Sequence, residues 1–237
     1  MREAFANQLM KLASSDPDIF FVTGDLGYGV FDEFKKNFPN QYLNVGVAEQ
    51  NMTSIATGLS FEGKKVFTYS IANFATLRCL EQIRNDAAYH RVNLTIVASG
   101  GGFTYGALGM SHHATEDIAI MRSLPDVEVL VPASPWETAE ATRILARRKG
   151  VSYLRIEKGG KNLKPLNRSR FKVGASNLYR HGSDVTIISC GGILNECMKA
   201  ASILLEDGIS CQVISMHTIK PIDKSTIYKA AKDTKLI

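Results

Sequence analysis

One carboxylate, Glu49, stands alone in an apolar and small-residue stretch that runs from Leu43 to Phe61. The pattern predicts a short strand at 42–45, a turn at Gly46 and a helix over 47–60, which puts Glu49 in the first turn of that helix. A first-turn glutamate commonly completes a helix cap, and the helix dipole stabilises it by about 0.3–1 kcal/mol when it is exposed. Burying a carboxylate costs several kcal/mol, so a buried Glu49 needs a further partner. From this segment alone, both a cap and a functional acid stay open.

Two glycine-rich loops follow apolar strands and carry other groups that are able to do chemistry. The first loop, 24–29, contains Asp25 but has neither the dinucleotide-binding nor the P-loop spacing, so an exposed turn explains it as well as a ligand site does. The second loop, 100–113, ends in Ser111-His112-His113. Histidine can give or take a proton near neutral pH, which suits acid–base work. No third ligand is spaced to complete a metal site with the two histidines, so we predict no metal held by this chain.

Strands and helices are predicted to alternate over the first part of the chain. Apolar runs of strand length occur at 19–23, 65–69, 92–99, 127–131 and 151–156. A segment with helical spacing at 3–14 precedes the first of them, and others separate them at 47–60, 73–90, 115–123 and 134–149. This alternation is typical of an α/β fold with a doubly wound parallel sheet. We therefore expect one domain at 1–160, a linker at 161–172, and a second, apparently incomplete α/β domain at 173–237, because a last strand is only beginning at 235–237.

Composition limits the class of protein. The 237 residues are 45% hydrophobic and 22% charged, as in ordinary soluble globular proteins. The net charge of +5 gathers around Arg147–Lys149 and the expected linker without interleaved aromatic residues, so we predict no nucleic-acid groove. The sequence has no apolar run that approaches a membrane span, and its first residues are unlike a signal peptide. The four cysteines lack CxxC spacing and fit reduced packing residues, so we expect a cytoplasmic protein that does not contact a membrane.

Three segments taken together carry a resemblance to a known family. They are 44–52 (NVGVAEQNM), 109–112 (GMSH) and 116–125 (EDIAIMRSLP). In this order they resemble the pyrimidine-binding domain of the thiamine-diphosphate-dependent transketolase family, over roughly residues 1–158, and the resemblance extends more weakly into the family's carboxyl-terminal domain. The chain is also similar to the split form of these enzymes, in which this half is a separate subunit.

The resemblance implies roles at the cofactor for three residues. Glu49 matches the glutamate that hydrogen-bonds the aminopyrimidine ring of thiamine diphosphate and favours its imino tautomer, so it would be both catalytic and cofactor-binding. Phe74 matches the aromatic residue that stacks on the pyrimidine, although a core phenylalanine would explain it too. Asp25 resembles the family's aspartate near the cofactor.

The resemblance also implies residues that bind the substrate. His112 matches the histidine that hydrogen-bonds the donor's hydroxyl group or the oxygen of the bound intermediate, which would make it a catalytic and a substrate-binding residue. Arg155 matches an arginine that holds substrate phosphate, a task suited to the planar guanidinium fork. Arg78 is a weaker candidate of the same kind.

Departures from the family pattern bear on the substrate and on the partner. Leu108 lies in a loop where sugar-phosphate transketolases carry an aspartate, and Gly100 replaces a phosphate-binding histidine. The family's diphosphate motif, GDG followed by an asparagine-rich partner, is absent from the sequence. We therefore expect an N-terminal diphosphate-binding transketolase subunit to bind the diphosphate and Mg²⁺, and this chain to form a homo-oligomer as well.

The leading interpretation is a subunit that transfers a two-carbon ketol unit between small sugar-type substrates. Within the family, deoxyxylulose-phosphate synthases and the β subunits of 2-oxoacid dehydrogenases are the alternatives. The former normally carry the loop aspartate, and the latter usually lack the Ser-His loop. A different class, a non-catalytic α/β nucleotide-binding or assembly domain, also stays open.

Overall fold

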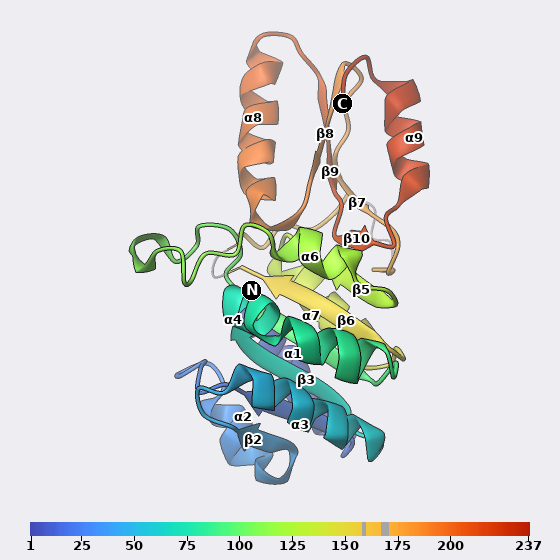
Figure 1. Ribbon diagram of the computed structural model, residues 1–237. Coiled ribbons are helices and arrows are strands. Elements are labelled where there is room, and N and C mark those ends of the chain that lie inside the picture. The colour runs from blue at the N-terminus through green and yellow to red at the C-terminus, as the bar shows by residue number, and fades with distance from the viewer. Residues whose placement is uncertain (158–159, 167–170) are drawn as a thin grey trace.

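A computed structural model describes residues 1–157, 160–166 and 171–237, and these residues form a seven-stranded and a three-stranded sheet (Figure 1). The large sheet has the order β10-β5-β6-β4-β3-β1-β2. Its strands are β1 (Ile19–Thr23), β2 (Tyr42–Asn44), β3 (Lys65–Ile71), β4 (Leu94–Ser99), β5 (Val127–Leu130), β6 (Val151–Ile156) and β10 (Thr218–Lys220). All neighbouring strands pair in parallel except β10, which is antiparallel to β5.

Helices cover both faces of the large sheet, as a doubly wound fold requires. One face packs against α1 (Arg2–Ala13), α2 (Asp32–Asn37) and α7 (Pro135–Leu145) through a core that includes Phe5, Phe34 and Leu145. The other face packs against α3 (Glu49–Phe61), α6 (Asp117–Ser123) and an irregular helical segment at 72–88. The predicted fold class is therefore confirmed, since the apolar runs of the central strands are buried between these two helix layers.

The irregular segment departs from the continuous helix that we expect at 73–90. It consists of α4 (Ala72–Thr76), a short 3₁₀ turn at Leu77–Cys79, α5 (Leu80–Gln82) and a π-helical stretch at Ile83–Ala88. Helical spacing in the sequence does not reveal such breaks, because each kind of turn still buries one side of the segment. The 3₁₀ turn carries Arg78, a residue of the candidate site.

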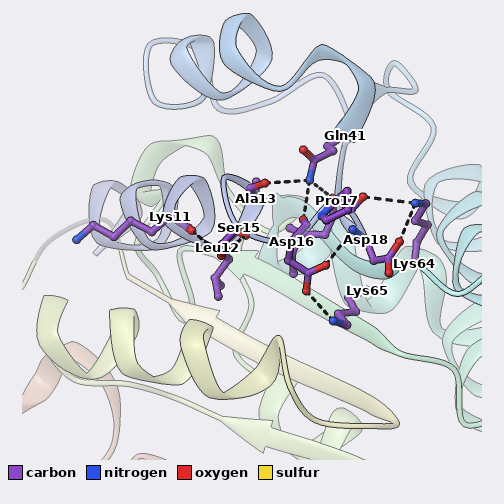
Figure 2. Close-up of polar contacts among 11 residues, drawn as sticks. Lys11, Leu12, Ala13, Ser15, Asp16, Pro17, Asp18, Gln41, Lys64 and Lys65 are labelled. Atoms are coloured by element: carbon purple, nitrogen blue, oxygen red, sulfur yellow. Dashed lines mark hydrogen bonds and ion pairs between the residues drawn. The ribbon is translucent and has the colours of Figure 1, made fainter.

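Polar side chains fix the connection between α1 and β1 at the amino-terminal edge of the sheet (Figure 2). The side-chain amide of Gln41 donates to the carbonyl groups of Asp16 and Ile19, at 3.0 and 2.8 Å. Lys65 Nζ lies 2.6 Å from a carboxylate oxygen of Asp16, and Lys64 makes a similar pair with Asp18 at 3.0 Å. These contacts hold the loop before β1, so that β1 and β3 run out together toward the opposite edge, where the candidate site lies.

The small sheet has the order β7-β9-β8. It consists of β7 (Asn177–Arg180), β8 (Val185–Ser189) and β9 (Cys211–Ser215), with α8 (Leu194–Glu206) and α9 (Lys224–Asp233) beside it (Figure 1). Leu236 adds a parallel bridge to Val185, where we expect a strand to begin. The expected linker, 161–172, lies partly outside the described residues.

Among the described residues, two of the contacts that tie the small sheet to the rest of the fold are ones that the sequence pattern does not predict. The first is β10, which follows β9 in the chain but pairs with β5 in the large sheet. The second is Glu137 on α7, whose fully buried carboxylate accepts hydrogen bonds from the side chains of Asn177, Tyr179 and Ser215 at 2.8–3.1 Å. Burial raises the pKa of Glu137, although these donors oppose the rise. The small sheet is therefore hydrogen-bonded to α7, which covers the large sheet, and is joined to the large sheet by the chain through β10.

Candidate active site

Glu49 is the first residue of α3, and its side chain is 1% exposed. Its carboxylate lies beside Gly24 at the end of β1, where an added Cβ would approach Glu49 Cγ to 3.2 Å. One oxygen accepts a hydrogen bond from Ser70 Oγ of β3 at 3.1 Å, and the other accepts one from Arg78 Nη1 at 2.7 Å. Both partners lie outside α3, so the carboxylate is held by other elements and the cap interpretation does not account for its contacts.

Arg78 links Glu49 to two other predicted residues. The carbon of its guanidinium group lies 4.3 Å from the centre of the Phe74 ring, a cation–π contact. The Phe74 ring meets the His112 ring edge-on, with 5.0 Å between ring centres. The structure therefore brings Glu49, Arg78, Phe74 and His112 into one continuous set of contacts, although they come from α3, the 72–88 segment and the loop after β4.

The loop that carries His112 is closed at its base by two backbone hydrogen bonds between Gly102 and Ala114, of 2.7 and 3.0 Å. Asn73 Nδ2 donates to the carbonyl of His113 at 2.7 Å, which ties the loop to the residue before Phe74. Within the loop, His112 Nδ1 lies 2.9 Å from Ser111 Oγ. The loop is therefore anchored at both ends, and its half-buried histidine faces Phe74.

Arg155 lies at the base of the same loop, where a buried acid holds it. Its Nε is 3.1 Å from a carboxylate oxygen of Asp117 on α6, and the same oxygen accepts a hydrogen bond from Tyr153 at 2.5 Å. Burial, reinforced by Asp117, raises the pKa of the Tyr153 hydroxyl. The guanidinium group lies so close to Gly101 that an added Cβ there would be 1.7 Å from Arg155 Nε, so this position requires glycine.

A groove of about 480 Å³ lies beside Arg155 and is lined also by Thr104, Glu157 and Cys190. The Arg155 side chain is only 12% exposed and already has Asp117 as its counter-charge. Among the described residues, no hydrogen bond, ion pair or ring contact joins Arg155 to His112, so these interactions do not link Arg155 to the Glu49 cluster. Its role in holding a substrate phosphate stays a prediction.

Asp25 lies at the carboxyl end of β1 in a left-handed backbone conformation, with φ of 55°. Its carboxylate accepts hydrogen bonds from the Tyr28 hydroxyl at 2.7 Å and from Asn44 Nδ2 at 2.9 Å, and these bonds lower its pKa. It follows Gly24, which lies against Glu49. Asp25 is thus near the site, and its role toward a cofactor stays a prediction.

Apolar side chains are exposed on the segments that carry the site. Val47 is 73% exposed just before α3, and Phe103, Leu108 and Met110 are 72%, 57% and 88% exposed on the His112 loop. Exposed apolar side chains of this size on the segments around one site commonly mark an interaction surface.

Sequence reasoning missed Ser70, Asn73 and the Glu49–Arg78 pair. A polar residue near the end of a central strand is a usable signal for Ser70, but Arg78 is 29 residues from Glu49 and shows no local pattern. Across the ranges that the structure describes, no group of three or more His, Cys, Asp or Glu side chains is arranged to hold a metal ion. In the same ranges, no helix is long and apolar enough to cross a membrane.

Comparisons with known proteins identify the family of this chain. A family model described as "Transketolase, pyrimidine binding domain" matches residues 1–162, and one described as "Transketolase, C-terminal domain" matches residues 174–237. The chain is 38% identical to a "Putative transketolase C-terminal section" of Methanocaldococcus jannaschii, over 97% of this chain and 74% of that protein. It is 35% identical to one of the subunits of an apulose-4-phosphate transketolase of Phocaeicola vulgatus, over 98% of this chain and 75% of that protein.

A solved structure described as "Split gene transketolase, inactive beta4 tetramer" has the same fold, with a TM-score of 0.88 and 34% identity over 98% of this chain and 76% of that one. The family models between them match nearly the whole chain, and the matched regions contain Glu49, Phe74 and His112 in one site. The chain therefore belongs to the transketolase family.

Proposed function

We propose that this chain is the pyrimidine-binding subunit of a thiamine-diphosphate-dependent transketolase-like transferase, which moves a two-carbon ketol unit between sugar-type substrates. The observation that carries the proposal is the buried Glu49 carboxylate, which lies in one contact set with an aromatic ring and a histidine. The relative from Phocaeicola vulgatus, which is named as a subunit of its transketolase, supports a division of the enzyme between two chains.

The residues of this site fit the pyrimidine end of the cofactor. Glu49 offers a carboxylate that is 1% exposed, which suits a hydrogen bond to a ring nitrogen in a dry site, and Phe74 offers a ring for stacking. For the diphosphate end, the family's motif of GDG followed by an asparagine-rich partner is absent from the sequence, and the described residues hold no group of three or more His, Cys, Asp or Glu side chains that could bind a metal ion. We therefore assign Mg²⁺ and the diphosphate to a companion subunit and place the active site between the two chains.

When bound, thiamine diphosphate would supply a thiazolium carbon that attacks carbonyl groups once its proton has passed to the aminopyrimidine. Glu49 would hold the proton at the pyrimidine ring nitrogen, and Ser70, which donates to it at 3.1 Å, would fix the orientation of the carboxylate. A positioned acid of this kind contributes roughly 10²–10⁴ in rate. Arg78 already pairs with Glu49, so a cofactor that binds this carboxylate must either share it with Arg78 or displace that side chain.

His112 would exchange a proton with a substrate hydroxyl group. Its ring stands against Phe74 and its Nδ1 is already paired with Ser111 Oγ, so Nε2 would be the atom that meets the substrate. Asp117 would hold Arg155 ready for the distal end of the substrate, and Asp25 would stand near the cofactor. Leu108, 57% exposed on the same loop, would give the donor subsite an apolar wall.

We also propose that this chain assembles with a companion chain and works in the cytoplasm. The exposed apolar side chains Val47, Phe103, Leu108 and Met110 suit burial against a companion chain and, in its absence, self-association. All four cysteines lie in the described part of the chain and are free thiols, which fits a reducing, cytoplasmic setting.

Reconstitution tests the proposed function. This chain is mixed with a chain that carries the diphosphate motif, thiamine diphosphate and Mg²⁺, and ketol transfer is followed with hydroxylated ketose donors and with pyruvate. We expect transfer from ketoses only in the mixture. Use of pyruvate alone would favour the synthase or dehydrogenase alternatives, and the absence of any cofactor-dependent circular dichroism signal in the mixture would favour the non-catalytic one.

A further inference from the structure

The Arg78 guanidinium group contacts both residues that the proposed function assigns to the aminopyrimidine, Glu49 and Phe74. Its Nη1 donates to Glu49 at 2.7 Å, and its central carbon lies 4.3 Å from the centre of the Phe74 ring. These are the acid and the aromatic ring that would hold the cofactor. One side chain of the free subunit therefore already contacts both halves of the pyrimidine subsite.

A guanidinium group and an aminopyrimidine ring present similar chemistry to these two partners. Each is planar, each carries N–H donors suited to a carboxylate, and each stacks on an aromatic face. We propose that Arg78 is an internal occupant of the pyrimidine subsite, which fills it in the cofactor-free chain and is displaced when thiamine diphosphate binds. This inference rests on the proposed function and adds to it a step of competition between a side chain and the cofactor.

Burial explains why the free subunit needs such an occupant. The Glu49 side chain is 1% exposed, and a buried carboxylate without a counter-charge is strongly destabilising. Ser70 supplies one neutral donor and no charge. Arg78 supplies the charge, and it lies over the Phe74 ring until the cofactor arrives.

The surroundings of Arg78 allow it to leave. The Arg78 side chain is 42% exposed, whereas the Glu49 side chain is 1% exposed. Rotation about the side-chain bonds of Arg78 therefore takes its guanidinium group into water. It stands on the 3₁₀ turn Leu77–Cys79, which the structure places between α4 and α5. Cofactor binding therefore requires no unfolding of the helical segment.

The competing interpretation predicts the opposite change in cofactor affinity when Arg78 is removed. If Arg78 stays beside Glu49 and binds substrate phosphate or the cofactor, its removal weakens binding. If it is an internal occupant, its removal strengthens cofactor binding, because the cofactor no longer competes with it. The dissociation constant of thiamine diphosphate therefore separates the two interpretations.

The experiment measures that dissociation constant at saturating Mg²⁺ in the enzyme assembled with its companion subunit. Arg78→Met keeps an apolar stem over Phe74 and removes the guanidinium group. Arg84→Met is the matched control, since Arg84 lies on the same segment and bonds only its neighbour Asn85 among the described residues. We expect Arg78→Met to bind the cofactor about tenfold more tightly, which corresponds to about 1.4 kcal/mol of lost competition, and Arg84→Met to match the wild type.

Two further measurements guard against a folding defect in Arg78→Met. In a Glu49→Gln background, which has no buried charge to neutralise, Arg78→Met is expected to leave the dissociation constant unchanged. A cofactor-bound structure of the wild-type assembly is expected to show the 2.7 Å pair of Glu49 and Arg78 broken.

An intact pair with cofactor bound, or unchanged or weaker binding by Arg78→Met, would overturn this inference while leaving the proposed function in place. Absence of cofactor binding by the wild-type assembly would overturn both.

Discussion

Glu49→Gln tests the central assignment, because glutamine keeps the shape of the side chain and removes its charge. The amide oxygen can still accept the hydrogen bond from Ser70, which is 3.1 Å from the carboxylate. The amide nitrogen then faces Arg78, donor against donor, and Arg78 turns to water because its side chain is 42% exposed. A partly exposed pair is worth about 1 kcal/mol or less. For a chain of this length, that is a fall in melting temperature of about 2–4 °C.

The effect on chemistry is much larger than the effect on stability. A carboxylate that holds the proton at the pyrimidine ring contributes roughly 10²–10⁴ in rate. We therefore expect hydrogen–deuterium exchange at the thiazolium carbon of the assembled Glu49→Gln enzyme to fall by that factor, while assembly measured by sedimentation stays intact. Exchange at this carbon needs no sugar substrate, so the assay isolates the role of Glu49 from every step of substrate binding.

Glu140→Gln is a control matched in chemistry and remote from the site. Glu140 pairs with Arg143 at 2.7 Å, the same distance that separates Glu49 from Arg78. Its loss removes an ion pair on α7 and is expected to leave the exchange rate unchanged. Equal exchange rates in the assembled wild-type and Glu49→Gln enzymes would refute the assignment of Glu49 as the residue that activates the cofactor.

Three other perturbations have expected outcomes. Leu108→Asp is expected to shift donor preference toward conventional hydroxylated sugar phosphates, because a charge-assisted hydrogen bond contributes about 1.5–3 kcal/mol; equal losses in kcat/KM for every donor would contradict this. The isolated chain, given thiamine diphosphate and Mg²⁺, is expected to be inactive and self-associated. A monomer in sedimentation would contradict self-association, and turnover without a second polypeptide would contradict inactivity. Burial lowers the pKa of His217 to about 4, below its unfolded value, so the free energy of unfolding is expected to fall as pH drops from 6.5 toward 4, by up to about 3 kcal/mol. His217→Asn should remove that part of the slope in urea titrations, and an unchanged slope would show that His217 is not its source.

The parts of the structure that sequence patterns predict are local. Apolar runs such as Ile19–Thr23 and Leu94–Ser99 become buried parallel strands, and the small-residue run after Gly46 becomes α3 with Glu49 at its start. Ser134 and Pro135 open α7 as their types indicate, and the Ser134 hydroxyl caps the helix by accepting from the Glu137 amide. In each case, neighbouring residues hold enough information to specify the element.

The parts that sequence patterns miss depend on distant partners. The need of Glu49 for a partner follows from the cost of burying it, but the identity of that partner, Arg78, depends on how the 72–88 segment packs over α3. The hydrogen bonds of Glu137 to Asn177, Tyr179 and Ser215 span 40 to 78 residues. The sequence around Glu137 does not predict these hydrogen bonds, because a glutamate in the first turn of a helix commonly interacts with the helix dipole alone.

Strand β10 has a consequence for the order in which the protein is made. Its residue Thr218 pairs with Leu130 of β5, so the large sheet keeps one unpaired edge until a much later part of the chain leaves the ribosome. At translation rates of about 5–20 residues per second, that edge stays open for several seconds. Unpaired strand edges attract other strands. During synthesis, β5 is therefore a place where a nascent chain is open to pairing with its neighbour on the same messenger RNA, and chaperone binding at this edge would protect it.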